Sequence, residues 1–165
     1  MSIDGKPHPH SFFRDGAETR DVDATVTKKS IELRSAINGL LVLKSTGSQF
    51  HGFLVDEYTT LKPTTDRILS TEVSAGWKWT FNDMSAVEAA TPKFNKAWED
   101  ARNITMKNFA EEDSPSVQNT MYKMCEQILA AVPEVTEVDY SLPNKHYFEI
   151  GMFIHSSACT NEQDN

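Results

Sequence analysis

The sequence predicts one α+β domain in which an antiparallel β-sheet carries two helices on one face. Two observations support this fold class. Apolar and polar residues alternate with the period of a strand in the first half of the chain and again near its end. Between these stretches, residues 94–132 repeat their apolar side chains at helical spacing. Strands, then helices, then a returning strand are typical of a sheet with its helices gathered on one side.

Composition restricts the class of protein. The chain has 165 residues, 39% hydrophobic and 24% charged, which fits a folded globular domain. Its net charge of −8 makes it a poor general binder of nucleic acid or anionic membrane, so an anion must be held by a few placed donors. No apolar run is long enough to cross a membrane, and we expect no secretory signal in residues 1–15. The two cysteines, Cys125 and Cys159, form no disulfide framework or metal-ligand motif.

The first part of the chain predicts a loop followed by a hairpin. Proline and glycine break regular structure in residues 1–19, which we expect to be a loop. Alternation through residues 22–33 predicts a half-buried strand. Asn38-Gly39 is typical of a two-residue hairpin turn, so we expect a turn there and a second, more buried strand over residues 40–43.

The next segment, residues 44–67, carries several aromatic side chains without any period. A long connection of this kind is where a binding site is often built, although the same aromatics could simply pin the loop to the core. The clearest strand follows at residues 69–79, with Val73, Trp77 and Trp79 facing one way.

Two helices and a strand complete the predicted fold. Apolar residues recur at helical spacing over residues 94–104. We expect Ser114 to cap the next helix and Pro133 to end it. Residues 135–150 return to strand character, with a proline that interrupts them, and residues 151–165 have the composition of a polar tail.

Four features could hold an anion or a heterocycle. Phe50 lies in the irregular loop, where a flat ligand could stack on its ring. Arg67 has a planar fork suited to an oxyanion or a heterocycle edge. The first turn of the second helix offers free N–H groups, and two polar residues follow the strand-breaking proline. Each has a simpler explanation: a core aromatic, a surface ion pair, an ordinary helix start and strand-end polar residues. The candidates in these last two features are Val117 and Gln118, and Asn144 and His146.

Four blocks of sequence resemble one enzyme family, uricase (urate oxidase), and most closely its fungal members. The longest block is residues 40–67, which matches the family pattern L-x-[LV]-L-K-[ST]-T-x-S-x-F, two following aromatics and a closing arginine. The other blocks are residues 6–12, 113–122 and 140–148. They stand in the family's order and spacing, so the resemblance covers about residues 2–150.

The resemblance implies a T-fold, in which an antiparallel sheet is backed by two helices. Family members are roughly twice as long as this chain and carry two T-folds in tandem. We therefore expect residues 1–150 to be a C-terminal T-fold domain of the uricase type, single and incomplete as a uricase. Residues 151–165 depart from the family and are expected to be a divergent polar tail.

The resemblance also implies a reaction. Urate, a planar anion, reacts with O2 and water to give 5-hydroxyisourate and H2O2, with no metal and no organic cofactor. By motif match, Phe50 would stack on the purine, and the planar guanidinium of Arg67 would bind its pyrimidine side. Asn144 would position O2 or water above the ring, and His146 would act catalytically in a proton relay. The opposite edge of the purine would be held by the Val117 N–H and the Gln118 amide.

The family further implies partners and a compartment. Its pocket lies between subunits of a homotetramer, and a lysine–threonine pair from the neighbouring N-terminal domain moves protons. This chain is thus expected to carry half of a pocket and to be inactive alone. Two alternatives stay open: a non-catalytic T-fold module that assembles with a full-length uricase subunit, and a T-fold enzyme of pterins, whose motifs match less well. The family implies a peroxisomal location, while the lack of a terminal Ser-Lys-Leu-type signal leaves a cytoplasmic one open.

Overall fold

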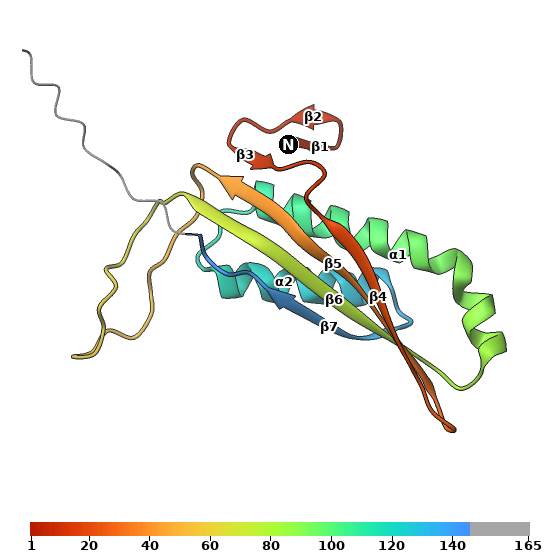
Figure 1. Ribbon diagram of the computed structural model, residues 1–165. Coiled ribbons are helices and arrows are strands. Elements are labelled where there is room, and N and C mark those ends of the chain that lie inside the picture. Colours follow the sequence, from red (N-terminus) through yellow and green to blue (C-terminus); the bar gives the residue numbers. More distant parts are fainter. Residues whose placement is uncertain (146–165) are drawn as a thin grey trace, which may run out of the picture.

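The computed structural model describes residues 1–145, and residues 146–165 lie outside this described part. Five strands form one antiparallel sheet in the order β3-β5-β6-β7, with β4 also paired to β5. Both helices cover the same face of this sheet (Figure 1), which confirms the predicted α+β class. The elements are β1 (Ser2–Ile3), β2 (Lys6–Pro7), β3 (Ser11–Phe13), β4 (Thr19–Val26), β5 (Ile31–Lys44), β6 (Leu69–Phe81), α1 (Met84–Glu111), α2 (Val117–Ala131) and β7 (Val135–Ser141).

The core lies between the central strands and the two helices. Strand β6 confirms the strand predicted at residues 69–79, and its Trp77 and Trp79 are 1% and 0% exposed. They form one apolar cluster with side chains of both helices, among them Phe109 of α1 and Met124 of α2. Within the described residues, neither helix is both long and apolar enough to span a membrane.

The predicted turn at Asn38-Gly39 is wrong, because β5 runs straight through it. Gly39 adopts a φ of 71°, and the register with β6 shifts between Ile37 and Leu40. The inward-facing positions therefore change from odd to even numbers at this point, as a β-bulge requires. Asn-Gly favours positive φ in a bulge as well as in a hairpin turn, so the dipeptide alone could not distinguish them. The hairpin turn lies at residues 27–30, where the Thr27 N–H donates to the Ser30 carbonyl at 2.9 Å.

The N-terminal segment expected to be a loop contains three short strands. Strands β1 and β2 form a small hairpin whose turn residues, Asp4 and Gly5, have φ values of 49° and 77°. Strand β3 pairs with the end of β5, with Ser11 opposite Lys44. Strands of two or three residues are too short to produce a detectable alternation in sequence.

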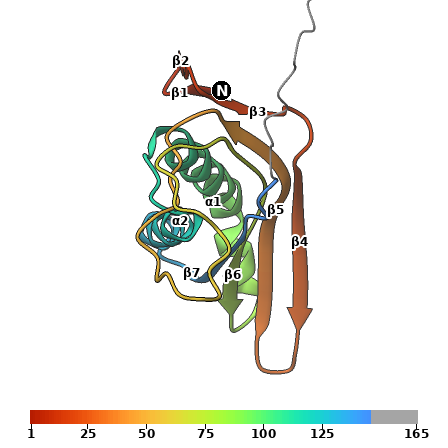
Figure 2. The ribbon, with the colours of Figure 1, turned by 90° about the vertical axis from the view of Figure 1, so that its left-hand side faces the viewer.

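The half-buried strand predicted over residues 22–33 is divided by the hairpin turn at residues 27–30: residues 31–33 belong to β5, and the part that lies in β4 is not half-buried. All eight residues of β4 are exposed, including Val22 at 58% and Val26 at 68%. The hairpin that joins β4 to β5 extends past the helices (Figure 2), so this part of the sheet has no covering layer. Alternating sequence predicts a strand but does not establish that another layer packs on its apolar side.

Helix α1 is longer than the predicted segment, residues 94–104. It begins after Asp83, whose side chain accepts a hydrogen bond from the Ala86 N–H at 2.9 Å, and it includes Pro92 in its third turn. Most of its first ten residues are exposed, so no apolar stripe marks them in the sequence.

The second helix begins two residues later than predicted. Its N-cap is Ser116, whose hydroxyl oxygen accepts from the Asn119 N–H at 3.1 Å. Ser114 instead uses its buried hydroxyl to bond the Ser116 carbonyl at 2.8 Å. Val132 caps the other end, just before Pro133 as predicted. Strand β7 then ends at Ser141, and the rest of the segment expected as strand lies partly outside the described residues.

Candidate functional site

A cavity of about 410 Å³ lies where the irregular loop meets the start of α2 and the segment after β7. Five of the six candidates from the sequence line it, so the fold brings together three segments that are distant along the chain. The sixth, His146, lies outside the described residues. The lining residues are Phe50, Leu61, Lys62, Thr64, Arg67, Val117, Gln118, Met121, Leu142 and Asn144.

Phe50 is fixed in the cavity wall by its backbone and by its ring. It forms an isolated antiparallel bridge with Thr64, in which each N–H donates to the other residue's carbonyl at 2.8 Å. Its ring stacks on Phe53 with centroids 4.5 Å apart. A ring held in this way presents an aromatic surface without a loss of side-chain entropy when a ligand binds.

Arg67 lies against the same aromatic ring. Its guanidinium carbon is 5.2 Å from the Phe50 ring centroid, within the range of a cation–π contact. Its Nε donates a long hydrogen bond of 3.4 Å to the hydroxyl of buried Ser48. Partial burial lowers the Arg67 pKa, but an arginine pKa is ordinarily so high that the group stays charged near neutral pH. No carboxylate is paired with it among the described residues, so its two terminal nitrogens remain available to an anion.

The residue before Arg67 holds two parts of the loop together. The Asp66 carboxylate accepts hydrogen bonds from the Thr46 hydroxyl at 2.8 Å and the Gly47 N–H at 3.0 Å. The Thr46 hydrogen bond, with help from backbone N–H groups, lowers the Asp66 pKa below its ordinary value. The carboxylate is therefore engaged within the loop and does not line the cavity.

A buried chain of polar contacts connects this loop to α2. The Gln49 N–H donates to the Ser114 carbonyl at 2.8 Å, and the Ser114 N–H donates to the Gly47 carbonyl at 3.1 Å. The Ser114 hydroxyl lies 2.5 Å from the Thr120 hydroxyl inside the helix. The separation between Arg67 and the start of α2 is thus set by hydrogen bonds rather than by loose packing.

The start of α2 forms another wall of the cavity. Within residues 1–145, the Val117 and Gln118 N–H groups have no hydrogen-bond partner, because they precede the first complete turn. Free N–H groups and the positive end of the helix dipole both favour an anionic ligand. No acidic residue stands in this first turn to compete for that position.

Asn144 completes the polar groups of the cavity. It lies after β7 and forms an isolated antiparallel bridge with buried Thr71 of β6. The Lys145 N–H beside it donates to the Ser70 carbonyl at 2.8 Å. The backbone is thus tied to the sheet at Asn144 and at the residue that follows it.

Half of the lining residues were not singled out from the sequence. Leu61, Lys62 and Thr64 belong to a loop without period, and nothing in their order indicates which side chains turn inward. Met121 lies one turn after Val117 on α2 and so reaches the cavity as well.

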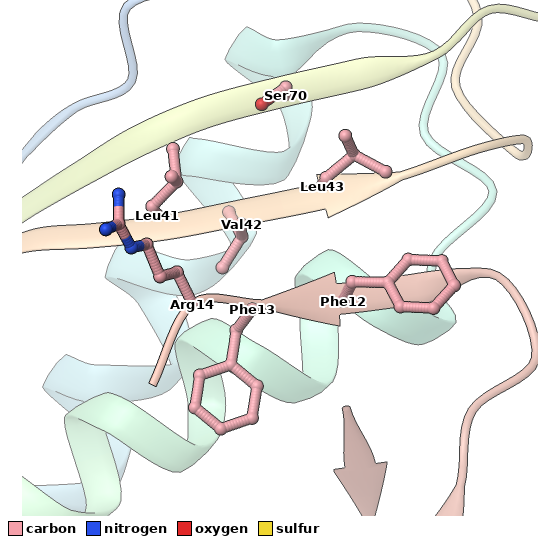
Figure 3. A pocket seen from close by; sticks show the side chains of 7 residues that line it. All are labelled: Phe12, Phe13, Arg14, Leu41, Val42, Leu43 and Ser70. Carbon is pink, nitrogen blue, oxygen red and sulfur yellow. The ribbon is translucent and has the colours of Figure 1, made fainter. Parts of the chain in front are cut away.

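A second cavity, of about 340 Å³, lies beside β3 and is mostly apolar (Figure 3). Arg14 and Ser70 are its polar residues, and it lacks the converging donors of the first cavity, so it offers little to orient a polar ligand. Its other lining residues are Phe12, Phe13, Leu41, Val42 and Leu43. Among residues 1–145, no three His, Cys, Asp or Glu side chains are grouped as a metal site would need.

Comparison with known proteins identifies the family. The uricase family profile matches residues 33–165. The uricase of Emericella nidulans is 57% identical over 166 residues, covering 99% of this chain and 55% of that protein. The chain belongs to the uricase family. The uricase of Aspergillus flavus is similar as well, at 58% identity over 157 residues, with 94% of this chain and 52% of the relative covered.

Solved structures agree with this family. The crystal structure of uricase from Arthrobacter globiformis matches with a TM-score of 0.72 and 36% identity, over 86% of this chain and 50% of that one. The uricase T-fold expected from the sequence is therefore confirmed. The chain spans about half the length of the curated uricases it matches.

Proposed function

We propose that this chain supplies the urate-binding part of a uricase site. One observation carries the proposal: five residues that match the family by motif come from three segments and line one cavity. They are Phe50, Arg67, Val117, Gln118 and Asn144. A family motif by itself predicts residue types, whereas convergence on a cavity supports a shared ligand.

The geometry suits a flat anion such as urate. Phe50 would stack on the heterocycle, and Arg67, charged and without a carboxylate partner among the described residues, would direct its N–H donors to one edge of it. The Val117 N–H and the Gln118 amide would bind another edge of the same ring. Donors at two edges fix both the position and the rotation of a planar ligand.

The proposed reaction is the two-electron oxidation of urate. Urate gives two electrons to O2, water adds to the ring, and the products are 5-hydroxyisourate and H2O2. In this chain Asn144 would hold O2 or water over the ring, and His146 would pass protons. The donors around the purine would stabilise the negative charge that the ring carries before it reacts.

Turnover is proposed to need a further part of the site. In the family the proton-relay pair comes from the N-terminal domain of a neighbouring subunit, and this chain spans about half the length of the uricases it matches. The purified chain should therefore bind urate, detected by calorimetry, without consuming it. Loss of urate absorbance with release of H2O2, at about 1 per second or faster, would contradict the proposal of a binding half-site.

Substitution of the arginine tests the binding mode. Arg67→Lys keeps the charge but loses the planar fork, so urate affinity should fall by about 1–3 kcal/mol. Arg14→Lys is the matched control, since Arg14 lines the second cavity. Unchanged urate affinity in Arg67→Lys would show that Arg67 is structural.

A second candidate function is a non-catalytic module that assembles with a full-length uricase subunit. The half-length match to the uricases favours it, because such a chain could replace one T-fold of a complete subunit. Co-purification with a full-length uricase, in the absence of urate binding by the chain alone, would support this candidate. A homotetramer and a peroxisomal location follow from the family and stay proposals, which light scattering and a fluorescent fusion would test.

A further inference from the structure

Lys62 is a cation that lines the cavity without a partner in the part of the chain that the structure describes. It is exposed, and within residues 1–145 it forms neither a hydrogen bond nor an ion pair. Most lysines of the described part behave differently, because their ammonium groups lie against carboxylates. The paired lysines are Lys78, Lys93, Lys96, Lys107, Lys123 and Lys145.

The cavity is positive although the chain is acidic. Its charged lining residues are Lys62 and Arg67, and no aspartate or glutamate lines it, in a chain whose net charge is −8. The nearest carboxylate along the chain, Asp66, accepts hydrogen bonds from Thr46 and Gly47. A concave surface lined by one sign of charge concentrates the field and attracts the opposite charge.

The two cations are held in different ways. Arg67 is fixed, with its Nε bonded to Ser48 and its guanidinium over the Phe50 ring. Lys62 lies on an exposed part of the loop, directly before Pro63, and its four-carbon side chain is not tied to any group of the described residues. A fixed planar fork suits recognition of a ligand edge, whereas a mobile ammonium suits attraction of charge without a set geometry.

We propose that Lys62 is a specificity residue that makes the cavity select the anionic form of a purine over neutral purines. It would do so by supplying a second positive charge beside Arg67, without a fixed contact of its own. This inference rests on the proposed urate function, because it names a role at the same site. It adds that charge recognition is divided between two side chains: Arg67, which contacts Ser48 and Phe50, and Lys62, which has no partner among the described residues.

The test compares charge variants at two salt concentrations. Urate binding is measured by calorimetry for the full 165-residue chain and for Lys62→Gln and Lys62→Glu, at about 20 mM and about 500 mM NaCl. Lys62→Gln should raise the urate Kd about fivefold at low salt, and Lys62→Glu should raise it further. At high salt the ratio of the variant Kd to the wild-type Kd should approach one for both variants, because exposed charges are screened. The Kd for hypoxanthine, a neutral purine, should not change.

A matched control and the arginine variant separate the possible failures. Lys28→Gln removes an equally exposed lysine from the β4–β5 turn and should leave urate binding unchanged. If Lys62→Glu binds urate like the wild type while Arg67→Lys is impaired, the role of Lys62 is overturned and the proposed function stands. A loss that is equal for hypoxanthine, or that persists at high salt, also overturns it. If the wild-type chain binds no urate, the proposed function fails, and this inference fails with it.

Discussion

The two ends of the β4–β5–β6 sheet use polar side chains in opposite ways. At the cavity end, Lys44, Ser48 and Ser114 are each 1–2% exposed. The Lys44 ammonium bonds the Glu112 carbonyl after α1, and the Ser114 hydroxyl bonds the Ser116 carbonyl at the start of α2. At the hairpin end, every residue of β4 is exposed to solvent. Buried polar groups are costly to leave without partners, whereas exposed ones exchange their partners for water. We therefore expect the loss of a polar side chain to cost more stability at the cavity end than at the hairpin end.

Lys44 should show the largest effect. It is 2% exposed, and its ammonium donates to the Glu112 carbonyl at the end of α1 at 2.6 Å. Lys44→Ala would leave both a void and an unpaired carbonyl, so we expect a loss of about 3 kcal/mol in the free energy of unfolding. Urea denaturation measures it. Lys44→Met is the control, because its side chain fills most of the void and leaves only the cost of the missing hydrogen-bond donor. Equal stability of wild type and Lys44→Ala would show that the buried Lys44–Glu112 hydrogen bond does not stabilise the fold.

Two serine substitutions test whether the two ends of the sheet differ. Ser114→Ala removes a buried hydroxyl that bonds the Ser116 carbonyl and the Thr120 hydroxyl, and should cost about 1–2 kcal/mol. Ser30→Ala, in the hairpin turn, removes a hydroxyl whose contact is with exposed Thr27 and should cost less than about 0.5 kcal/mol. Urate affinity should fall in Ser114→Ala alone, because the Ser114 hydroxyl holds the start of α2, which lines the cavity. Equal costs at the two positions would show that the ends do not differ.

Much of this arrangement was predictable from the sequence because long, regular patterns record burial. Strand β6 and the apolar face of α2 were found from periodicity, and residues 40–67 carried enough family motif to indicate the site. The bulge at Gly39 was missed because its dipeptide also fits a hairpin turn. Ser114 and Ser116 are both suitable caps, and only the tertiary contacts of Ser114 decide between them. Loop residues such as Lys62 give no signal, since their direction depends on a backbone without period.

The Asp66 carboxylate gives a prediction about pH. Its pKa lies below the ordinary 3.8 because the Thr46 hydroxyl bonds the charged form. A group with a lowered folded pKa stabilises the fold above its unfolded pKa, and this contribution is lost as pH falls through the folded value. Wild type should therefore be more stable than Asp66→Asn at pH 6, and the difference should shrink below about pH 4.

The control for Asp66 lies at the other end of the sheet. Asp23→Asn removes a β4 carboxylate that has no hydrogen-bond partner among the described residues. Urea denaturation at several pH values should show a pH-dependent stability difference for Asp66→Asn and none for Asp23→Asn. A difference that is the same at pH 6 and pH 3 would mean that Asp66 acts through packing rather than through its charge.

The smallest effect is expected for the exposed valine near the end of β4. Val26 is 68% exposed, so Val26→Thr keeps the side-chain shape, removes little buried apolar area and should change the free energy of unfolding by less than about 0.5 kcal/mol. Val73→Thr makes the same change at a position with 0% exposure, where an unpaired hydroxyl should cost about 1–3 kcal/mol. Light scattering alongside the urea curves reports the oligomeric state. If Val26→Thr costs as much as Val73→Thr, or if it shifts an oligomer towards monomer, then β4 is covered by another chain in solution, and the hairpin end is an interface rather than a tolerant edge.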